Sequence, residues 1–227
     1  MERVTLAELM GPLNENEKKF APPVVFVEGN RSLMADGPRV SIIGSRKASK
    51  EGLENAAALA RALVKKGIIV VSGLAEGIDT VAHKTAMNKG GKTIAVLGTP
   101  LDRCYPAENR ELQDEIMKNQ LVISQFVPLS PVQEKNFVMR NRTMALISHA
   151  SVVVEAAEKS GTRYQAWEAL RLGRPLFILE SVAKDQKLKW PKEVMKYGAR
   201  VISVKDVKPL LDVLPASGGL VSLDVAF

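Results

Sequence analysis

The stretch Val40-Ser-Ile-Ile-Gly-Ser-Arg46 decides how the rest of the chain is interpreted. An apolar run ends in a glycine and two polar residues, and Ser49 then precedes a segment with apolar residues on one helical face. This pattern predicts a strand, a tight turn and a helix whose N-cap is Ser49. Free N–H groups and the positive dipole end of such a helix favour an anion. Because Gly44 permits close approach and Arg46 offers a planar fork of donors, the stretch fits an anion site at Gly44, Ser45 and Arg46; taken alone, it fits a turn that serves only the fold equally well.

The composition is that of a water-soluble globular protein. Of 227 residues, 46% are apolar and 25% are charged, and 32 Lys and Arg stand against 25 Asp and Glu, giving a net charge of +7. This excess is compatible with nucleic acid or another polyanion. The single cysteine, Cys104, excludes an internal disulfide and a zinc site built from cysteines. With no run of about 18 apolar residues and no signal-peptide core, we expect no membrane association and a cytoplasmic location.

Strands alternate with helices along most of the chain. The apolar run Ile68–Ser72 predicts a second strand, and the glycine-bearing turn Gly73–Asp79 leads from it into a second helix. Further strands are expected at 93–97, 121–124, 152–155, 175–179 and 200–203. Because Pro128 and Pro131 interrupt the segment 125–138, we expect it to be irregular, with a helix resuming near Arg140. The alternation predicts an α/β protein with a doubly wound, mostly parallel sheet, which binds ligands at the carboxyl ends of its strands.

A basic and aromatic segment follows the fourth of these strands. Lys135-Asn136-Phe137 and Arg140-Asn141-Arg142 place three cations and one ring within eight residues, without an acid. Single-stranded DNA binding uses this combination, with cations on phosphates and a ring on which a base stacks. Alternatively, the segment is a solvated basic loop with Phe137 in the core. Arg140 and Arg142 lie two residues apart at the start of a helix, so their side chains cannot both point toward the DNA. One of them can instead have a structural role.

No constellation of catalytic residues is evident. Asp79 and His83 lie four residues apart on a predicted helix, where we expect a structural hydrogen bond that orients the second glycine turn. Two such residues do not make a metal site, and no nucleophile lies near them. We therefore expect a protein that is not an enzyme and has no catalytic residue, metal or cofactor.

Several sequence blocks, spread over residues 22 to 180, together resemble the DNA-processing protein A (DprA, or Smf) family. The blocks are Gly44-Ser45-Arg46, Ser72-Gly-Leu-Ala-Glu-Gly-Ile-Asp79 with Ala82-His83, Ile94-Ala-Val-Leu-Gly98, Leu101-Asp102 with Tyr105-Pro106 and Asn109, Phe137-Val-Met-Arg-Asn-Arg142, Val153-Val-Glu155-Ala156 with Ser160-Gly161, and Gly173-Arg174. The resemblance implies an extended Rossmann-like domain that binds single-stranded DNA, usually as a homodimer. It also implies a recombination mediator that loads a RecA-type recombinase on incoming DNA during natural transformation and displaces single-strand-binding protein.

The resemblance also implies which residues bind DNA and how the chain is divided. The expected DNA and phosphate contacts are Gly44, Ser45, Arg46, Ser72, Gly73, Gly77, Lys135, Asn136, Phe137, Arg140, Asn141 and Arg142. We expect a short N-terminal segment (1–20), the Rossmann-like domain (21–205), and a C-terminal helix and tail (206–227) without a winged-helix domain. Three residues depart from the family pattern: Glu76 replaces an arginine, Gln125 a glutamate and Val138 a proline.

Two other functions fit parts of the sequence. A non-catalytic sensor of a nucleotide-derived ligand would use the same anion pocket. Ser160-Gly-Thr162 with Glu168 faintly resembles the lysine-decarboxylase-like (LOG) phosphoribohydrolases. Those enzymes carry a Pro-Gly-Gly-x-Gly-Thr block with carboxylates close behind it. Here Glu158-Lys159 takes the place of the leading Pro-Gly, and Arg163-Tyr164 that of the carboxylates.

Overall fold

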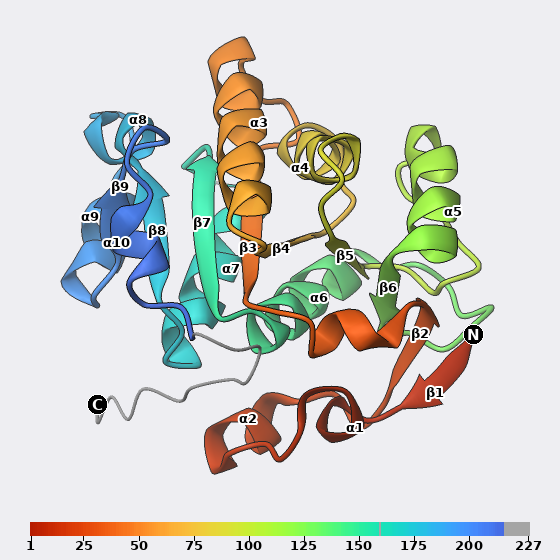
Figure 1. Cartoon of the computed structure of the whole chain (residues 1–227). Coiled ribbons are helices and arrows are strands. Elements are labelled where there is room, and N and C mark those ends of the chain that lie inside the picture. Colours follow the sequence, from red (N-terminus) through yellow and green to blue (C-terminus); the bar gives the residue numbers. More distant parts are fainter. Residues whose placement is uncertain (159, 216–227) are drawn as a thin grey trace.

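The centre of the structure is a sheet whose strands run in the order β1-β2-β6-β5-β4-β3-β7-β8-β9 (Figure 1). The computed structural model describes residues 1–158 and 160–215. The strands are β1 (Glu2–Val4), β2 (Val25–Gly29), β3 (Arg39–Gly44), β4 (Ile69–Ser72), β5 (Thr93–Leu97), β6 (Leu121–Ser124), β7 (Ala150–Glu155), β8 (Leu176–Leu179) and β9 (Arg200–Ile202). All pairs from β6 to β9 are parallel, whereas β2 pairs antiparallel with both β1 and β6.

Helices cover both faces of this sheet, so the predicted doubly wound α/β fold is confirmed. The helices are α1 (Leu6–Met10), α2 (Glu15–Phe20), α3 (Lys50–Lys65), α4 (Ile78–Asn88), α5 (Arg110–Asn119), α6 (Glu134–Ile147), α7 (Gly161–Arg171), α8 (Glu180–Lys184), α9 (Trp190–Lys196) and α10 (Lys208–Leu211). Figure 1 shows α3, α4 and α5 on one face and α6 and α7 on the other. The chain runs from β3 through β4 and β5 to β6, and then returns to place β7 on the other side of β3. A crevice for ligands is expected where the strand order reverses in this way, beside the carboxyl ends of β3 and β7.

Strand β3 has apolar side chains on both sides because both of its faces are covered. Val40 and Ile42 pack into a core with Leu59 and Leu63 of α3, whereas Ile43 belongs to the core of the opposite face. Successive strand residues point to opposite faces, so one apolar run supplies two cores. The nearly continuous apolar pattern, broken in β3 by the buried Arg39 and Ser41, follows directly from this double burial.

The helix that follows β3 begins as predicted, and α6 begins earlier than predicted. The Oγ of Ser49 accepts a hydrogen bond of 3.0 Å from the N–H of Gly52, which confirms Ser49 as the N-cap of α3. The expectation of irregular structure through Val138 is wrong, because α6 starts at Glu134. Both prolines precede the cap residue Gln133, so neither removes a hydrogen bond from the helix.

The two ends of the chain pack against this sheet. Near the start, β1 pairs with β2, and the buried Glu17 of α2 forms an ion pair with Arg174, which is also buried. Near the end, α10 fits the helix expected after residue 206, while the rest of the expected tail, 216–227, lies outside the described residues. None of the helices in the described part of the chain has the length and apolar character that a bilayer crossing needs.

The turn after β3 is closely packed, which gives Gly44 a structural role. A Cβ at this position would lie 2.5 Å from Cγ1 of Ile78 and 3.0 Å from the carbonyl oxygen of Glu155. We expect Gly44→Ala to lower the free energy of unfolding by about 1–3 kcal/mol, because overpacking at a closely packed site costs that much. Gly161→Ala is the matched control, since a Cβ at 161 meets nothing within 4 Å. Urea unfolding of both variants checks this, and equal stabilities would contradict it.

Candidate nucleic-acid interface

A cleft of about 500 Å³ lies where the strand order reverses, at the carboxyl ends of β3 and β7. It is lined by Ile43, Gly44, Ser45, Arg46, Lys47, Ala75, Asp79, Phe137, Val138, Arg140, Asn141, Ser160, Gly161, Thr162 and Gln165. Six of the twelve expected DNA-binding residues therefore share one cleft: Gly44, Ser45, Arg46, Phe137, Arg140 and Asn141. Gly73 lines a smaller recess beside it, together with Arg46, Glu76 and Tyr105.

The N-terminus of α3 is not the open anion site that the sequence predicted. The carboxylate of Glu155 at the end of β7 accepts hydrogen bonds from both the backbone N–H and the Oγ of Ser49. A Cβ on Gly52 would lie 2.3 Å from Oε2 of Glu155, so a glycine at 52 makes room for the carboxylate. The helix dipole of α3 is thus met by an anion from within the protein. Strand pairing between β3 and β7 brings Glu155 there, and a linear sequence does not reveal it.

Arg140 lies inside the protein, behind the cleft. Its side chain is 5% exposed, and Nη1 donates to the carbonyl oxygens of Gly73 and Val96, the second at 2.7 Å. A Cβ on Gly73 would lie 2.0 Å from this Nη1, so only glycine fits at 73. Burial lowers the pKa of Arg140 and the nearby Asp79 carboxylate opposes that change. Arg140 therefore joins the ends of β4 and β5 and lends its charge to the back of the cleft.

The front of the cleft carries an exposed cation against two aromatic rings. The guanidinium carbon of Arg46 lies 5.3 Å from the ring centroid of Phe137 and 5.9 Å from that of Tyr105. The two rings are 5.3 Å apart, and Tyr105 is 52% exposed. Phe137 is half-buried over Gly98, where a Cβ would lie 2.4 Å from its ring. We call Arg46, Tyr105 and Phe137 the aromatic corner.

Four of the expected contacts have roles in the fold. Ser72 is fully buried and its Oγ donates to the carbonyl of Ile42, and Asn136 is 5% exposed. Gly77 adopts a φ of 74°, and a Cβ there would lie 2.4 Å from the carbonyl oxygens of Ser45 and Arg46. Arg142 does not face the cleft, because Nε and Nη2 donate to the carboxylate of Glu168 at 2.8 and 3.2 Å.

The remaining contact, Lys135, is exposed in the first turn of α6, next to the cleft residue Phe137 along the chain. Sequence reasoning left several residues out of the site, among them Tyr105 of the recess and Ser160 and Gln165 of the cleft. Tyr105 follows β5 and Ser160 follows β7, so their position at the carboxyl ends of strands was the available signal. Gln165 lies inside a helix, and no sequence pattern marks it as a site residue.

Asp79 orients the second glycine turn as expected, but without His83. Oδ2 of Asp79 accepts hydrogen bonds from the N–H groups of Gly73 and Ala75 at 3.2 and 3.4 Å. His83 instead lies 2.7 Å from the hydroxyl of Thr93, which donates to the carbonyl of Val70. The described residues hold no group of three or more His, Cys, Asp or Glu arranged for a metal ion.

Glu168, on which the phosphoribohydrolase interpretation depends, is committed to the fold. It is 7% exposed and is held by Arg142 and by Arg171, whose Nη1 donates to Oε1 at 3.2 Å. Within the described ranges, Glu168 does not line the cleft. This carboxylate is therefore not placed to act on a ligand bound there.

Fold and site together define an α/β protein with a basic, aromatic cleft at the switch point of its sheet. The model of the family described as DNA recombination-mediator protein A matches residues 6–214, and the chain belongs to this family. The resemblance to the DprA/Smf family is thereby confirmed. The chain is 33% identical to the DNA processing protein DprA of Bacillus subtilis over 187 residues, which are 82% of this chain and 63% of that protein. It is 38% identical to the protein Smf of Synechocystis over 184 residues, or 80% of this chain and 46% of that one.

Two solved structures share the fold over nearly the whole chain. DprA of Streptococcus pneumoniae superposes with a TM-score of 0.79 at 33% identity, over 91% of this chain and 72% of that one. DprA of Helicobacter pylori superposes with a TM-score of 0.79 at 26% identity, over 95% of this chain and 98% of that one. The H. pylori structure is described as giving insight into the single-stranded DNA binding mode of that protein.

Because His83 is fully buried, its protonation opposes folding. Burial lowers the pKa of His83 from 6.5 to about 3, so below pH 6.5 the unfolded chain takes up a proton that the folded chain does not. Stability is therefore lost as the pH falls from 6.5 towards 3, by about 1.4 kcal/mol per pH unit at most. In His83→Asn, whose amide can still donate to Thr93, this loss should disappear. Urea unfolding at pH 7, 6 and 5 checks it, and equal pH slopes for both proteins would contradict it.

Proposed function

We propose that this protein binds single-stranded DNA across the aromatic corner and delivers the strand to a RecA-type recombinase, with no catalytic activity of its own. The observation that carries the proposal is the position of the exposed Arg46 guanidinium beside the rings of Tyr105 and Phe137. A cation for the phosphate and a ring for the base are what binding without sequence preference requires. In a duplex the bases are already stacked on one another, so the rings favour single strands.

The charges around the corner support binding of a polyanion. Lys47 and Lys135 are exposed and lie close to Arg46 and Phe137 along the chain, and none of these three cations forms an ion pair with a described residue. Behind them Arg140 adds a buried positive charge. Glu76 is the exposed acid nearest the recess that Arg46 and Tyr105 line. Arg46, Lys47 and Lys135 thus supply exposed cations for contact with phosphates, with the exposed acids Glu76 and Glu134 beside them.

The family supplies the remaining parts of the proposal. The H. pylori relative binds single-stranded DNA, and the family is named for recombination mediation. A mediator hands its strand to a recombinase, so we include a RecA-type partner and a homodimeric assembly in the proposal. Cleavage of DNA or nucleotides is not expected, because the cleft contains no nucleophile activated by a neighbouring base in the described residues.

The direct experiment is a gel shift with single-stranded and duplex oligonucleotides of equal length at two salt concentrations. We expect tighter binding to the single strand at both concentrations, and weaker binding of each at higher salt. Equal affinity for both forms, or no binding of either, would contradict the proposal. If mononucleotides added as competitors displace the single strand, the cleft binds a free nucleotide, which would favour the sensor function instead.

Arg46 should carry a large share of the affinity. A bidentate, charge-assisted contact with phosphate is worth about 1.5–3 kcal/mol, so Arg46→Ala should weaken single-strand binding about tenfold or more. Arg61→Ala is the matched control, because Arg61 is exposed on α3 and does not line the cleft. Both variants should melt close to the unchanged protein. If Arg46→Ala and Arg61→Ala lose the same affinity, Arg46 contributes only to the overall positive charge of the protein and makes no specific phosphate contact.

Salt dependence separates the phosphate contacts from the stacking contact. Each phosphate neutralised contributes about −0.7 to the slope of log affinity against log salt concentration for single strands. Lys135→Ala should therefore flatten that slope by roughly 0.7 of a unit. Phe137→Ala should leave the slope unchanged and cost roughly 1–3 kcal/mol of binding, the usual value for one stacked base.

Melting temperature is the control for Phe137, since its ring also packs over Gly98. Phe137→Leu fills much of the same space without an aromatic face, so it should fold well and still bind poorly. If Phe137→Leu binds as tightly as the unchanged protein, the ring serves the fold and only the cations contact DNA.

A further inference from the structure

The N-terminus of α7 opens into the cleft without a cap. The N-cap residue Ser160 is extended, with φ −79° and ψ 152°, and its side chain makes no capping hydrogen bond. Its Oγ is buried and has no partner in the described part of the chain. The N–H groups of Gly161 and Thr162 belong to the first helical turn, which has no intrahelical acceptor for them. All three residues line the cleft.

Gln165 provides a second, independent sign of a ligand. Its side chain is 2% exposed and lines the cleft, yet its Nε2 has no hydrogen-bond partner among the described residues. A buried amide donor normally has an acceptor, so an unpaired one at the wall of a cleft can donate to a ligand bound there. Gln165 lies three residues after Thr162 and therefore on the same face of α7. The open helix end and the unpaired amide meet at one place.

The N-terminus of α3, the other helix that begins at this edge of the sheet, differs from that of α7. Both helices follow neighbouring parallel strands, β3 and β7, at the switch point of the sheet. The end of α3 is closed by the carboxylate of Glu155, whereas α7 receives no such group from the described residues. The first turn of α7 therefore leaves room for an anion from outside the protein.

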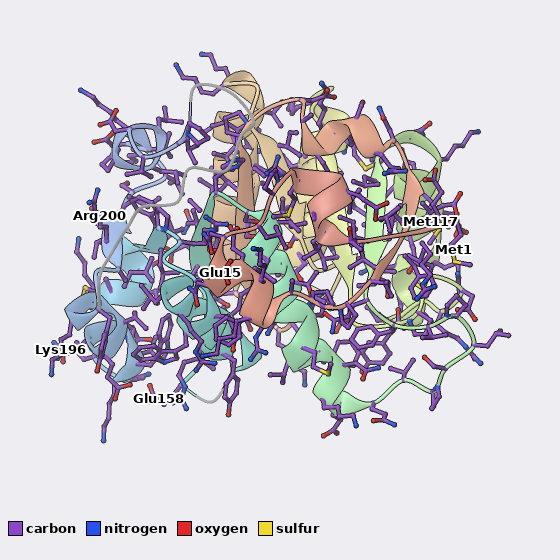
Figure 2. All side chains as sticks on the ribbon, turned by 90° about the horizontal axis from the view of Figure 1, so that it is seen from below. Met1, Glu15, Met117, Glu158, Lys196 and Arg200 are labelled. Atoms are coloured by element: carbon purple, nitrogen blue, oxygen red, sulfur yellow. The ribbon has the colours of Figure 1, made fainter. Side chains whose placement is uncertain are left out.

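The acids nearest this opening are engaged elsewhere. Glu158, just before α7, accepts a hydrogen bond of 2.8 Å from the N–H of Lys189, and it lies on the same side of the molecule as Lys196 (Figure 2). Asp79 accepts from the second glycine turn, and the charge of Arg140 acts on it. The groups presented to the cleft at α7 are therefore donors.

We infer that the N-terminus of α7 binds a phosphate group of a nucleotide, in the same cleft as the aromatic corner but on residues outside it. The N–H groups of Gly161 and Thr162, Oγ of Ser160 and Nε2 of Gln165 are its donors. A strand of DNA and a free nucleotide offer the same phosphate chemistry. The idea that the phosphate belongs to a DNA strand rests on the proposed function, whereas the phosphate site itself does not.

Gly161→Pro removes one donor without disturbing the helix. Proline is favoured at the first helical position, and the extended Ser160 before it has the backbone conformation that a following proline requires. A Cβ at 161 meets nothing within 4 Å. The variant should therefore melt at or above the temperature of the unchanged protein. Because a hydrogen bond to a charged group is lost, its affinity for thymidine 5′-monophosphate should fall about tenfold.

Gln165→Glu tests the amide in the same way, since it exchanges a donor for a carboxylate of the same shape that repels phosphate. Gln186→Glu is the matched control, because it adds the same charge on an exposed loop. Gln165→Glu should lose affinity for thymidine 5′-monophosphate by tenfold or more, whereas Gln186→Glu should bind as the unchanged protein does.

The binding readout is an NMR titration of the full chain labelled with ¹⁵N. Inorganic phosphate and thymidine 5′-monophosphate should shift the backbone amides of Gly161 and Thr162 and the side-chain amide of Gln165, whereas thymidine should not. Shifts of the same signals with oligothymidylate identify the strand as the phosphate source, and shifts with the mononucleotide alone identify a free nucleotide.

Two results would overturn the inference: phosphate shifts confined to Arg46 and its neighbours, or unchanged phosphate affinity in a folded Gly161→Pro variant. If oligothymidylate binds but does not shift the amide signals of Gly161, Thr162 and Gln165, the proposed function survives and this inference fails. If the mononucleotide binds α7 and no strand binds anywhere, the proposed function fails and the inference stands.

Discussion

The burial of the Arg140 guanidinium is the constraint on which the ligand-binding edge of the sheet depends. A charge in the interior is tolerated only with partners, and Arg140 finds them in the carbonyls of Gly73 and Val96 and in the charge of Asp79. These contacts join α6 to the ends of β4 and β5 and fix the turn that Asp79 orients. Because Arg140 lies on the same helix as Phe137, holding it also sets where that ring meets Arg46.

The glycines at this edge show how closely its loops approach one another. At 73 and 98 the missing Cβ makes room for Arg140 and for the ring of Phe137, and at 77 it makes room for the carbonyls of the first turn. These contacts fix the loops and the ring of Phe137, on which the proposed strand would lie. A preformed site loses little conformational freedom on binding, which leaves more of the contact energy as affinity.

The sequence predicted the fold well because its strongest signals are local. Runs such as Val40–Ile43 are apolar on both faces and alternate with helices, and the Ser49 cap follows from its own neighbours. The site was predicted only in part, because tertiary contacts decide the role of a polar residue. Nothing near Arg142 in sequence indicates that Glu168, 26 residues later, neutralises it, and nothing near Ser49 indicates Glu155. Gln165 resembles any other helical glutamine until the cleft around it is seen.

If single-stranded DNA lies across the aromatic corner, photo-crosslinking should locate it there. The probe is a thymidine oligonucleotide carrying 5-iodouracil, with mass spectrometry to identify the attached residues. We expect crosslinks to Tyr105 and Phe137, which unmodified single strand competes away and duplex does not. Crosslinks confined to other surfaces, such as the exposed strand β9 beside α9, would contradict it.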